Sequence, residues 1–189
     1  MPTMKTGLSR LFFALALLPS IAAAQAPKPA SKALPPVAAK PERTTASFGD
    51  WVLRCDSSGS AAKRVCETAQ GMTVQGQTSP IAQIAIGSPD AKTPRQLTLA
   101  VPPNLAFAVK PQIFSGRPGA APIELTWQRC TPGACFASGQ ISDSLLALLG
   151  TETEPGRISF KDAADRDATL PLSFRGLSQA LDALAKEAN

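Results

Sequence analysis

The chain of 189 residues contains no histidine and no tyrosine. Without histidine there is no Ser-His-Asp or Cys-His nucleophile system and no His-ligated zinc, and the commonest general base of enzymes is missing. A serine nucleophile with a lysine base has little support, because Ser57 and Ser58 precede Lys63 only across an expected hairpin loop. Phosphate-binding and dinucleotide-binding glycine motifs are absent as well. We therefore predict that the protein is not an enzyme, has no catalytic residues and binds no cofactor.

An excess of charge of one sign is absent from most of the chain. The formal net charge of +5 comes from residues 1–47, which hold six Lys or Arg residues and one Glu. From Phe48 onward acidic and basic residues balance, so this part has no positive surface charge to attract a phosphate backbone. We expect no nucleic-acid partner.

Only one long hydrophobic run is present. Leu11 to Leu18 follows the basic residues Lys5 and Arg10 and precedes small residues that end at Ala24. This pattern predicts a secretory signal peptide over residues 1–24, because a membrane span needs about 20 apolar residues. The residue directly after the expected cleavage point is not a cysteine, so the new N-terminus has no thiol that could be lipidated. We expect a periplasmic or secreted product without stable membrane insertion.

Cysteine is limited to four residues, and in an exported chain an even number indicates disulfides. Four cysteines allow three pairings, and the sequence alone does not choose among them. We favour the local pairs Cys55 with Cys66 and Cys130 with Cys135, since each lies within a single turn or hairpin. A redox-active pair is disfavoured, because four residues rather than two separate Cys130 from Cys135.

Residues 25–47 are rich in proline, alanine and lysine and show no apolar periodicity. Such a segment buries too little apolar surface to fold, so it is predicted to be a disordered linker. A proline-rich ligand for another domain is the alternative. The folded domain is predicted to span residues 48–189.

Period-two alternation of apolar and polar residues dominates from Phe48 onward. The clearest case places Ile123, Leu125 and Trp127 on one face of a half-buried strand. The same pattern predicts strands over residues 51–55, 81–86, 97–101, 107–109, 158–160 and 170–174. Two helices are predicted, over residues 142–149 and 177–184. The expected fold is mainly antiparallel all-β: an immunoglobulin-like β-sandwich, stapled by disulfides, with one or two short helices.

Two groups of side chains are candidate ligand sites with ordinary structural explanations. Asp162, Asp165 and Asp167 offer oxygen ligands for calcium, but a turn between strands also favours aspartate, so no metal site is expected. Trp51 and Trp127 are candidates to line a ligand site. Their strand positions favour packing against the disulfides instead.

The order of these motifs resembles the invasion-associated locus B (IalB) family over residues 48 to about 185. The resemblance rests on FGDWVLRC from Phe48 to Cys55, on Arg64-Val65-Cys66 with Gln70, on Arg129-Cys130-Thr131-Pro132 with Cys135 and Ala137, and on Pro171-Leu172-Ser173-Phe174 with Gly176, Ala180 and Leu184. One departure is that the family motif usually has glycine directly before the second cysteine. Here Gly133 comes one place earlier and Ala134 fills that position.

The resemblance implies a periplasmic or secreted β-sandwich without enzymatic activity or cofactor, associated in some pathogens with invasion of host cells. It offers no catalytic residues to carry over. We therefore predict a non-enzymatic binding module with an unknown protein or cell-envelope partner, acting in host invasion or in the envelope.

The loop from Phe114 to Pro122 is the candidate interaction surface. It places Phe114 and Arg117 among glycine and proline, although an ordinary hairpin turn explains these residues too. Two other functions stay open. One is a periplasmic chaperone or inhibitor that adds an edge strand to a client. The other is a hydrolase with two carboxylates about 5 to 10 Å apart in a cleft.

Overall fold

The computed structural model describes residues 42–57, 64–73, 76–88 and 93–187. The predicted signal peptide and most of the predicted linker lie outside these residues. In chain order the strands are β1 (Arg43–Phe48), β2 (Trp51–Asp56), β3 (Val65–Met72), β4 (Ala82–Gly87), β5 (Gln96–Val101), β6 (Gln112–Phe114), β7 (Ile123–Glu124), β8 (Thr126–Cys130), β9 (Cys135–Gln140), β10 (Gly156–Lys161) and β11 (Asp167–Leu172). The helices are α1 (Asp143–Leu149) and α2 (Leu177–Glu187).

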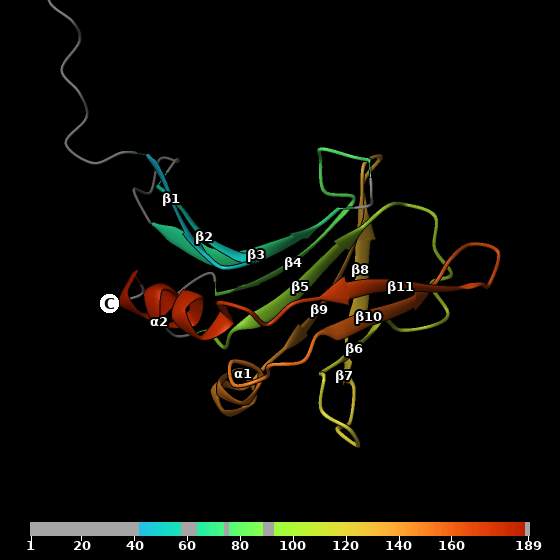
Figure 1. Ribbon diagram of the computed structural model, residues 1–189. Coiled ribbons are helices and arrows are strands. Elements are labelled where there is room, and N and C mark those ends of the chain that lie inside the picture. The colour runs from blue at the N-terminus through green and yellow to red at the C-terminus, as the bar shows by residue number, and fades with distance from the viewer. Residues whose placement is uncertain (1–41, 58–63, 74–75, 89–92, 188–189) are drawn as a thin grey trace, which may run out of the picture. The chain divides into compact units, whose positions relative to one another are not determined.

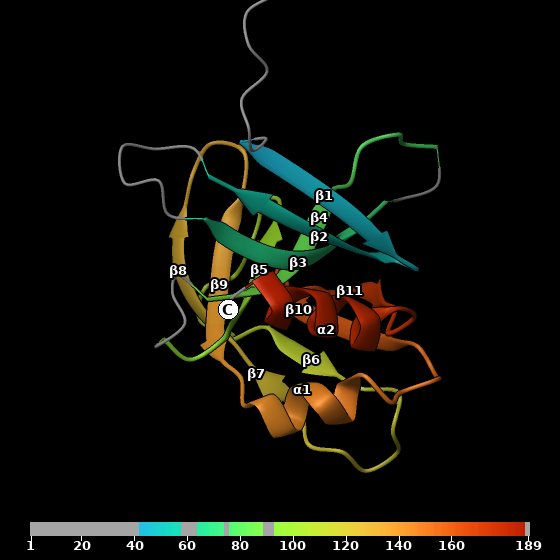
Figure 2. The same cartoon turned by 90° about the vertical axis from the view of Figure 1, so that its left-hand side faces the viewer.

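The strands form two antiparallel sheets, which confirms the predicted β-sandwich class (Figure 1). The larger sheet has the order β1-β2-β3-β4-β5-β9-β8, and the smaller has the order β11-β10-β6-β7. Helix α2 lies between the β2–β3 part of the larger sheet and α1, as a second view also shows (Figure 2). One cluster of buried apolar side chains draws on both sheets and both helices. Within the described ranges, neither helix has the length and apolar character needed to cross a bilayer.

Strand β2 shows how the alternating pattern produces the core. Trp51, Leu53 and Cys55 are buried, whereas Val52 and Arg54 between them are exposed or half-buried. Successive side chains of a strand point to opposite faces, so each apolar residue of the pattern reaches the interior. The predictions over residues 97–101 and 158–160 correspond to β5 and β10 in the same way. The prediction over residues 81–86 corresponds to β4, which buries three consecutive residues, Ile84 to Ile86.

Strand β1 begins at Arg43, five residues before the expected start of the folded domain at Phe48. Most of its side chains are exposed. The segment therefore lacks the alternation of apolar and polar residues by which a strand is predicted from the sequence. The strand instead forms through backbone pairing with β2, in register from Arg43 with Asp56 to Phe48 with Trp51. The expected linker therefore ends earlier than composition indicates.

The strand predicted over residues 107–109 is wrong. These residues form a turn after an isolated bridge at Leu105, and the next strand is β6. Pro102, Pro103 and Pro111 flank the segment, and proline removes backbone donors that a strand needs. Phe107 and Val109 consequently remain largely exposed.

The strand predicted around Leu125 is divided between the two sheets. Ile123 pairs in β7 with β6 of the smaller sheet, whereas Trp127 pairs in β8 with β9 of the larger sheet. Leu125 lies at the crossing, is 0% exposed and donates its N–H to the Pro111 carbonyl at 2.9 Å. The alternation was therefore predicted correctly, but one strand became two.

Both predicted helices are present. Helix α1 is capped by Ser142, whose hydroxyl accepts the Leu145 N–H at 3.2 Å, and it ends at Gly150. Helix α2 buries the residues of its apolar stripe, which are Leu177, Ala180, Leu181 and Leu184.

The two disulfides join Cys55 to Cys66 and Cys130 to Cys135, the local pairing that the sequence favoured. Each joins residues directly opposite in neighbouring strands, β2 with β3 and β8 with β9. The disulfides therefore fasten two hairpins rather than the two sheets to each other.

Candidate functional site

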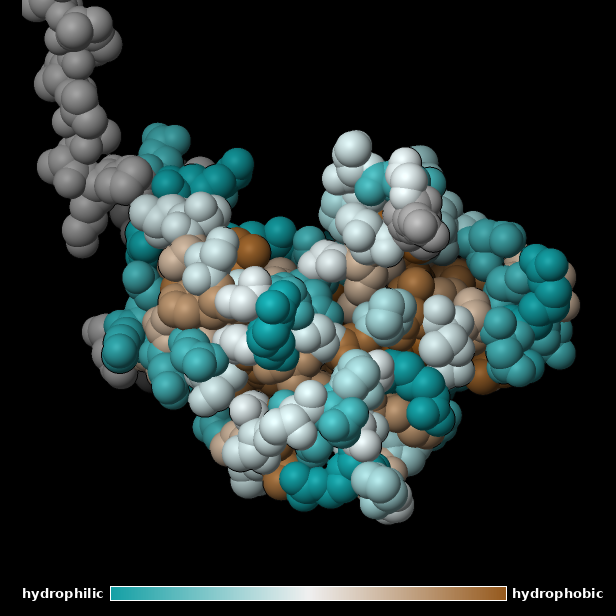
Figure 3. Space-filling model, in the orientation of Figure 1, coloured by the Kyte–Doolittle hydropathy of each residue, from teal (hydrophilic) through white to brown (hydrophobic). Residues whose placement is uncertain are grey.

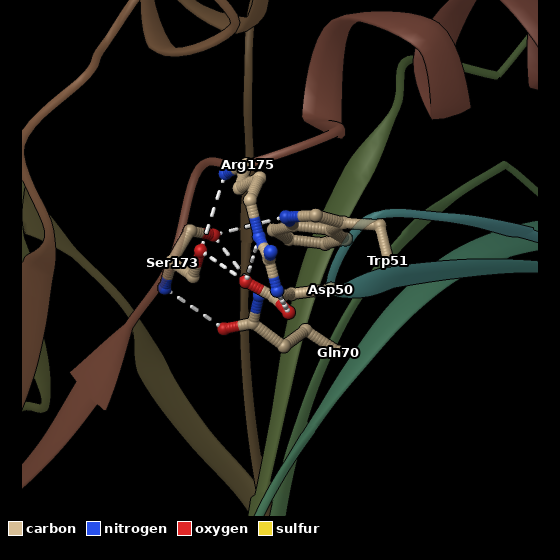
Figure 4. A network of polar contacts seen from close by, with 5 residues as sticks. All are labelled: Asp50, Trp51, Gln70, Ser173 and Arg175. Carbon is tan, nitrogen blue, oxygen red and sulfur yellow. Dashed lines mark hydrogen bonds and ion pairs between the residues drawn. The ribbon is translucent and has the colours of Figure 1, made fainter.

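A polar cluster fastens the turn between β1 and β2 to the segment between β11 and α2 (Figure 4). We call Asp50, Trp51, Gln70, Ser173 and Arg175 the polar clasp. The Ser173 carbonyl accepts the Trp51 indole N–H at 2.9 Å and the Gln70 amide at 3.0 Å, and the Ser173 N–H donates to Gln70 Oε1 at 3.0 Å. Asp50 accepts from Ser173 Oγ at 2.6 Å and from the Arg175 guanidinium at 2.5 and 3.1 Å.

The electrostatics of the clasp hold Asp50 in its ionised form. The hydrogen bond from Arg175 and then that from Ser173 lower the pKa of the Asp50 carboxyl below 3.8. The same contact raises the pKa of Arg175. The arrangement is suited to holding two segments together.

Close backbone packing accompanies the clasp. Gly49 has φ +58° and Gly176 has φ +89°, a region that favours glycine. A side chain at Gly176 would collide with the Phe48 carbonyl, and one at Gly49 would lie 2.5 Å from the Arg175 carbonyl. The two turns therefore touch through backbone atoms at the clasp.

The clasp brings together residues from sequence motifs that stand far apart along the chain. Asp50 and Trp51 come from the FGDW motif, Gln70 follows the second cysteine, and Ser173 belongs to the PLSF motif. Residues separated by more than 100 positions meet at one point. These residues, on which the family resemblance rests, thus have a structural role that their spacing in the sequence does not reveal.

A shallow groove of about 530 Å³ lies beside the clasp, lined by residues between 150 and 155 and between 173 and 179. A smaller groove of about 230 Å³ lies between α1 and α2. Three carboxylates in or beside these grooves pair with arginine: Asp50 with Arg175, Glu152 with Arg117 at 3.1 Å, and Asp143 with Arg95 at 3.2 Å. Asp182 also lines the smaller groove, together with Asp143. The hydrolase alternative needs two carboxylates in one cleft, and of these carboxylates Asp143 and Asp182 share a groove.

The candidate interaction loop has internal partners. The Arg157 guanidinium lies 4.1 Å from the centre of the Phe114 ring, and Arg117 forms its ion pair with Glu152. The Glu152 side chain is only 9% exposed, so Arg117 compensates a carboxylate that is largely removed from water. Phe114 and Arg117 therefore have structural roles in the loop, whether or not a partner also contacts them.

A separate group of apolar side chains, two exposed and one half-buried, lies at the β8 edge of the larger sheet. We call Phe107, Val109 and Trp127 the aromatic patch. Phe107 is 55% exposed and packs edge-to-face on Trp127 with ring centroids 5.6 Å apart. The Trp127 indole N–H donates to the Val109 carbonyl at 2.9 Å, which ties the turn to the strand. Both rings are thus held in place while Phe107 remains open to solvent.

The opposite face of the β8–β9 hairpin carries a cation–aromatic contact, because Arg129 is paired with Phe136 whereas Trp127 is paired with Ala137. The Arg129 guanidinium lies 5.5 Å from the centre of the Phe136 ring on β9. On the face shown in Figure 3, by comparison, polar residues separate the apolar surface into small areas. The sequence pattern indicates Trp127 as a candidate ligand-site residue but predicts a strand over Phe107 and Val109, so it does not reveal that the three lie together.

Comparison with known proteins decides the family. The sequence model described as "Invasion associated locus B (IalB) protein" matches residues 51–185, which is most of the chain. This chain belongs to the invasion associated locus B family. No match was found among the curated proteins.

A solved structure agrees with this family assignment. This invasion associated locus B chain is similar to the crystal structure of invasion associated protein b from Bartonella henselae, with a TM-score of 0.63 and 20% sequence identity. The similarity covers 76% of this chain and 96% of the Bartonella chain. At this identity the likeness shows the shared fold.

The aspartate cluster of this family member forms a turn. Asp162 Oδ1 accepts the N–H groups of Ala164 and Arg166 at 2.9 Å each, and Arg166 also pairs with Asp162 Oδ2. These hydrogen bonds lower the pKa of Asp162. Asp167 pairs separately with Lys161 at 3.0 Å. The carboxylates of Asp162 and Asp167 thus have partners within the turn. The sequence favoured such a turn as the alternative to a calcium site.

Both tryptophans belong to the main apolar cluster, which also contains Cys135 of the second disulfide. Trp51 lies in the main core and Trp127 packs on Phe107, whereas Cys55 belongs to a separate small cluster with Leu53 and Leu184. Glu187 approaches the Cys55–Cys66 disulfide, but disulfide sulfurs are poor metal ligands, and Arg64 holds that carboxylate at 2.8 Å.

One further spacing bears on the alternative of a serine nucleophile with a lysine base. Ser60-Ala61-Ala62-Lys63 has the Ser-x-x-Lys spacing of some serine hydrolases. The structure does not describe residues 58–63, which include Ser58, Ser60 and Lys63. Ser57 comes directly before this segment.

Proposed function

We propose that this chain is an exported, non-enzymatic binding protein of the invasion associated locus B type, and that the aromatic patch contacts its protein partner. The observation that carries the proposal is Phe107, an aromatic side chain held 55% exposed against Trp127. Contiguous exposed apolar surface marks interaction sites, whereas single exposed apolar side chains are ordinary. Aromatic residues and arginine dominate binding energy at protein interfaces.

The surroundings of the patch favour a protein partner. Val109, 40% exposed, extends the exposed apolar surface that Phe107 begins. The hydrogen bond from Trp127 to Val109 fixes the patch before binding, and a preorganised surface loses less conformational freedom in a complex.

Export is supported by two features. Both cysteine pairs are disulfides, which form and persist in oxidising compartments. Residues 1–24 have the basic, apolar and small-residue regions of a signal peptide. The setting we propose is therefore the periplasm or the exterior, where an envelope or host-cell protein is the accessible partner.

The test is crosslinking of the natural protein in its own cells, followed by identification of captured proteins by mass spectrometry. The informative variant is Phe107→Ala, which removes the exposed ring and leaves Trp127 in place. Leu148→Ala on α1 is the matched control, because Leu148 is an apolar residue of similar exposure, 42%, outside the patch. A partner captured by wild type and by Leu148→Ala but lost in Phe107→Ala supports the proposal. A partner captured equally by all three chains contradicts it.

The loop predicted from the sequence is tested in the same assay by Arg117→Ala. Because Arg117 pairs with the largely buried Glu152, we expect this variant to lower stability and to retain the partner. If Arg117→Ala loses the partner at a temperature where the variant is folded, the result indicates that the loop, and not the aromatic patch, contacts the partner.

A further inference from the structure

The four strands at the ends of the two sheets differ in their ability to accept another strand. Those edges are β1 and β8 in the larger sheet and β11 and β7 in the smaller sheet. Three of them carry features that obstruct pairing. Strand β7 has only two residues, β8 is irregular between Trp127 and Arg129, and β11 contains Pro171. Short length, bulges and proline are the features by which edge strands avoid further pairing.

Strand β1 carries none of these features. It pairs with β2 without interruption from Arg43 to Phe48 and contains neither proline nor a bulge. Its one charged residue, Arg43, is paired with Asp56 at 3.0 Å. Among the described strands, β1 is therefore the regular and nearly uncharged edge.

The hydrogen-bond pattern shows which backbone groups of β1 face outward. The Ser57 N–H donates to the Glu42 carbonyl at 2.7 Å, so Glu42 faces β2. In an antiparallel pair this orientation alternates along the strand. Thr44 and Ala46 consequently also face β2. The N–H and C=O groups of Arg43, Thr45 and Ser47 point to the open edge.

We propose that β1 pairs antiparallel with β1 of a second copy of this chain, around a two-fold axis at Thr45. Outward-facing groups can exchange hydrogen bonds only with outward-facing groups. The register that meets this requirement and pairs all three outward-facing residues places Thr45 opposite Thr45 of the second copy and Arg43 opposite Ser47 of the second copy. The two seven-stranded sheets then continue into each other.

Charge and side-chain pairing favour a second copy as the occupant of the edge. In this register no charged residue stands opposite a like charge, because each Arg43 is opposite a serine. Threonine opposite threonine is a favourable cross-strand pair. A two-fold arrangement also uses the same strand from both chains, as isologous interfaces require. The strand is thus complementary to itself without rearrangement of β2.

The pairing should be weak and dependent on concentration. A contact made by one six-residue strand from each chain is smaller than a standard stable interface. We expect a monomer–dimer equilibrium in the micromolar range or weaker, on the order of 10⁻⁶ to 10⁻⁴ M.

Sedimentation equilibrium of the oxidised, exported product over a concentration series tests the proposal. Thr45→Lys places two like charges opposite each other at the axis and is expected to weaken the dimer by roughly tenfold or more. The control is Val52→Lys on β2, which is opposite Ser47 in the register and shares its exposed face. That variant adds the same charge away from the edge and should dimerise like wild type. A protein that stays monomeric at every concentration, or a dimer unaffected by Thr45→Lys, overturns the proposal.

A crosslinking experiment then tests the register. Thr45→Cys should form an intermolecular disulfide on mild oxidation, because directly hydrogen-bonded residues have Cα atoms about 5.5 Å apart, within disulfide range. Ser47→Cys is the control, since the two copies of residue 47 would be about 13 Å apart along the strands. Equal crosslinking of both variants indicates random collision and overturns the register. A monomer whose β1 edge instead crosslinks to a different protein overturns the proposal in favour of a client strand.

Discussion

At the scale of single residues, the polar clasp concentrates the interactions that hold the turn between β1 and β2 against the start of α2. Asp50 is its charged centre, with hydrogen bonds from Arg175 and Ser173. Because those bonds are stronger to the ionised carboxylate, the pKa of Asp50 is lower in the folded chain than in the unfolded chain. A lowered folded-state pKa stabilises the fold above the unfolded value and loses that effect as pH falls.

We predict that Asp50→Asn lowers the free energy of unfolding by about 1 kcal/mol near neutral pH, the scale of a partly exposed charged hydrogen bond. The difference from wild type should shrink as pH falls below the ordinary aspartate value of 3.8, because wild-type Asp50 then becomes protonated as well. Urea unfolding of both chains at several pH values measures this. A difference that stays constant from neutral pH to below 3.8 would show that the charge of Asp50 does not stabilise the clasp.

Gly176 is the backbone counterpart of this clasp. We predict that Gly176→Ala destabilises the fold by about 2 kcal/mol or more, because φ is +89° and the added carbon meets the Phe48 carbonyl. Gly133→Ala is the matched control, since a carbon added there has no atom within 4 Å and φ is not positive. Its effect should stay within about 0.5 kcal/mol. Equal losses in thermal or urea unfolding would refute the close approach at Gly176.

At the scale of elements, the disulfides stabilise two hairpins of different loop length. The Cys55–Cys66 pair spans 11 positions and the Cys130–Cys135 pair spans 5. A longer closed loop restricts the unfolded chain more, so we predict a loss of about 3 kcal/mol for Cys55→Ser with Cys66→Ser and about 2 kcal/mol for Cys130→Ser with Cys135→Ser. Guanidinium unfolding of the two double variants measures both. A larger loss for the second double variant would contradict this ranking.

The second hairpin also explains a departure from the family motif. Gly133 has no positive φ, and Thr131 closes the turn by accepting the Ala134 N–H at 3.2 Å and donating to the Ala134 carbonyl at 3.1 Å. The turn therefore accommodates Ala134 directly before Cys135. The departure leaves the disulfide intact.

The elements differ in how well the sequence predicts them, for physical reasons. Strands with one buried face, such as β2 and β5, have a period of two that the sequence displays directly. Strand β1 has no such period, because its stability comes from backbone pairing at an edge. The turn around Phe107 resembles a strand in composition, but the flanking prolines and the contact with Trp127 determine its structure.

At the scale of the whole molecule, the sandwich class and the family follow from the sequence, whereas the sites do not. The segment around Leu125 changes sheets, and its alternating residues cannot show which strand each half will join. The clasp and the aromatic patch bring together residues from distant or irregular segments. Local patterns do not encode those contacts, so the candidate loop with Phe114 and Arg117 was the accessible prediction.

The central claim, that the aromatic patch binds a protein partner, is tested most directly by the affinity of the captured partner for purified chains. Loss of one central aromatic side chain from an interface costs about 2 kcal/mol, so we predict a Kd roughly 30-fold higher for Phe107→Ala. Leu148→Ala, altered at a similarly exposed residue on α1, should bind within about twofold of wild type. A Kd for Phe107→Ala equal to that of wild type, with both chains folded, would contradict the account and place the binding surface elsewhere.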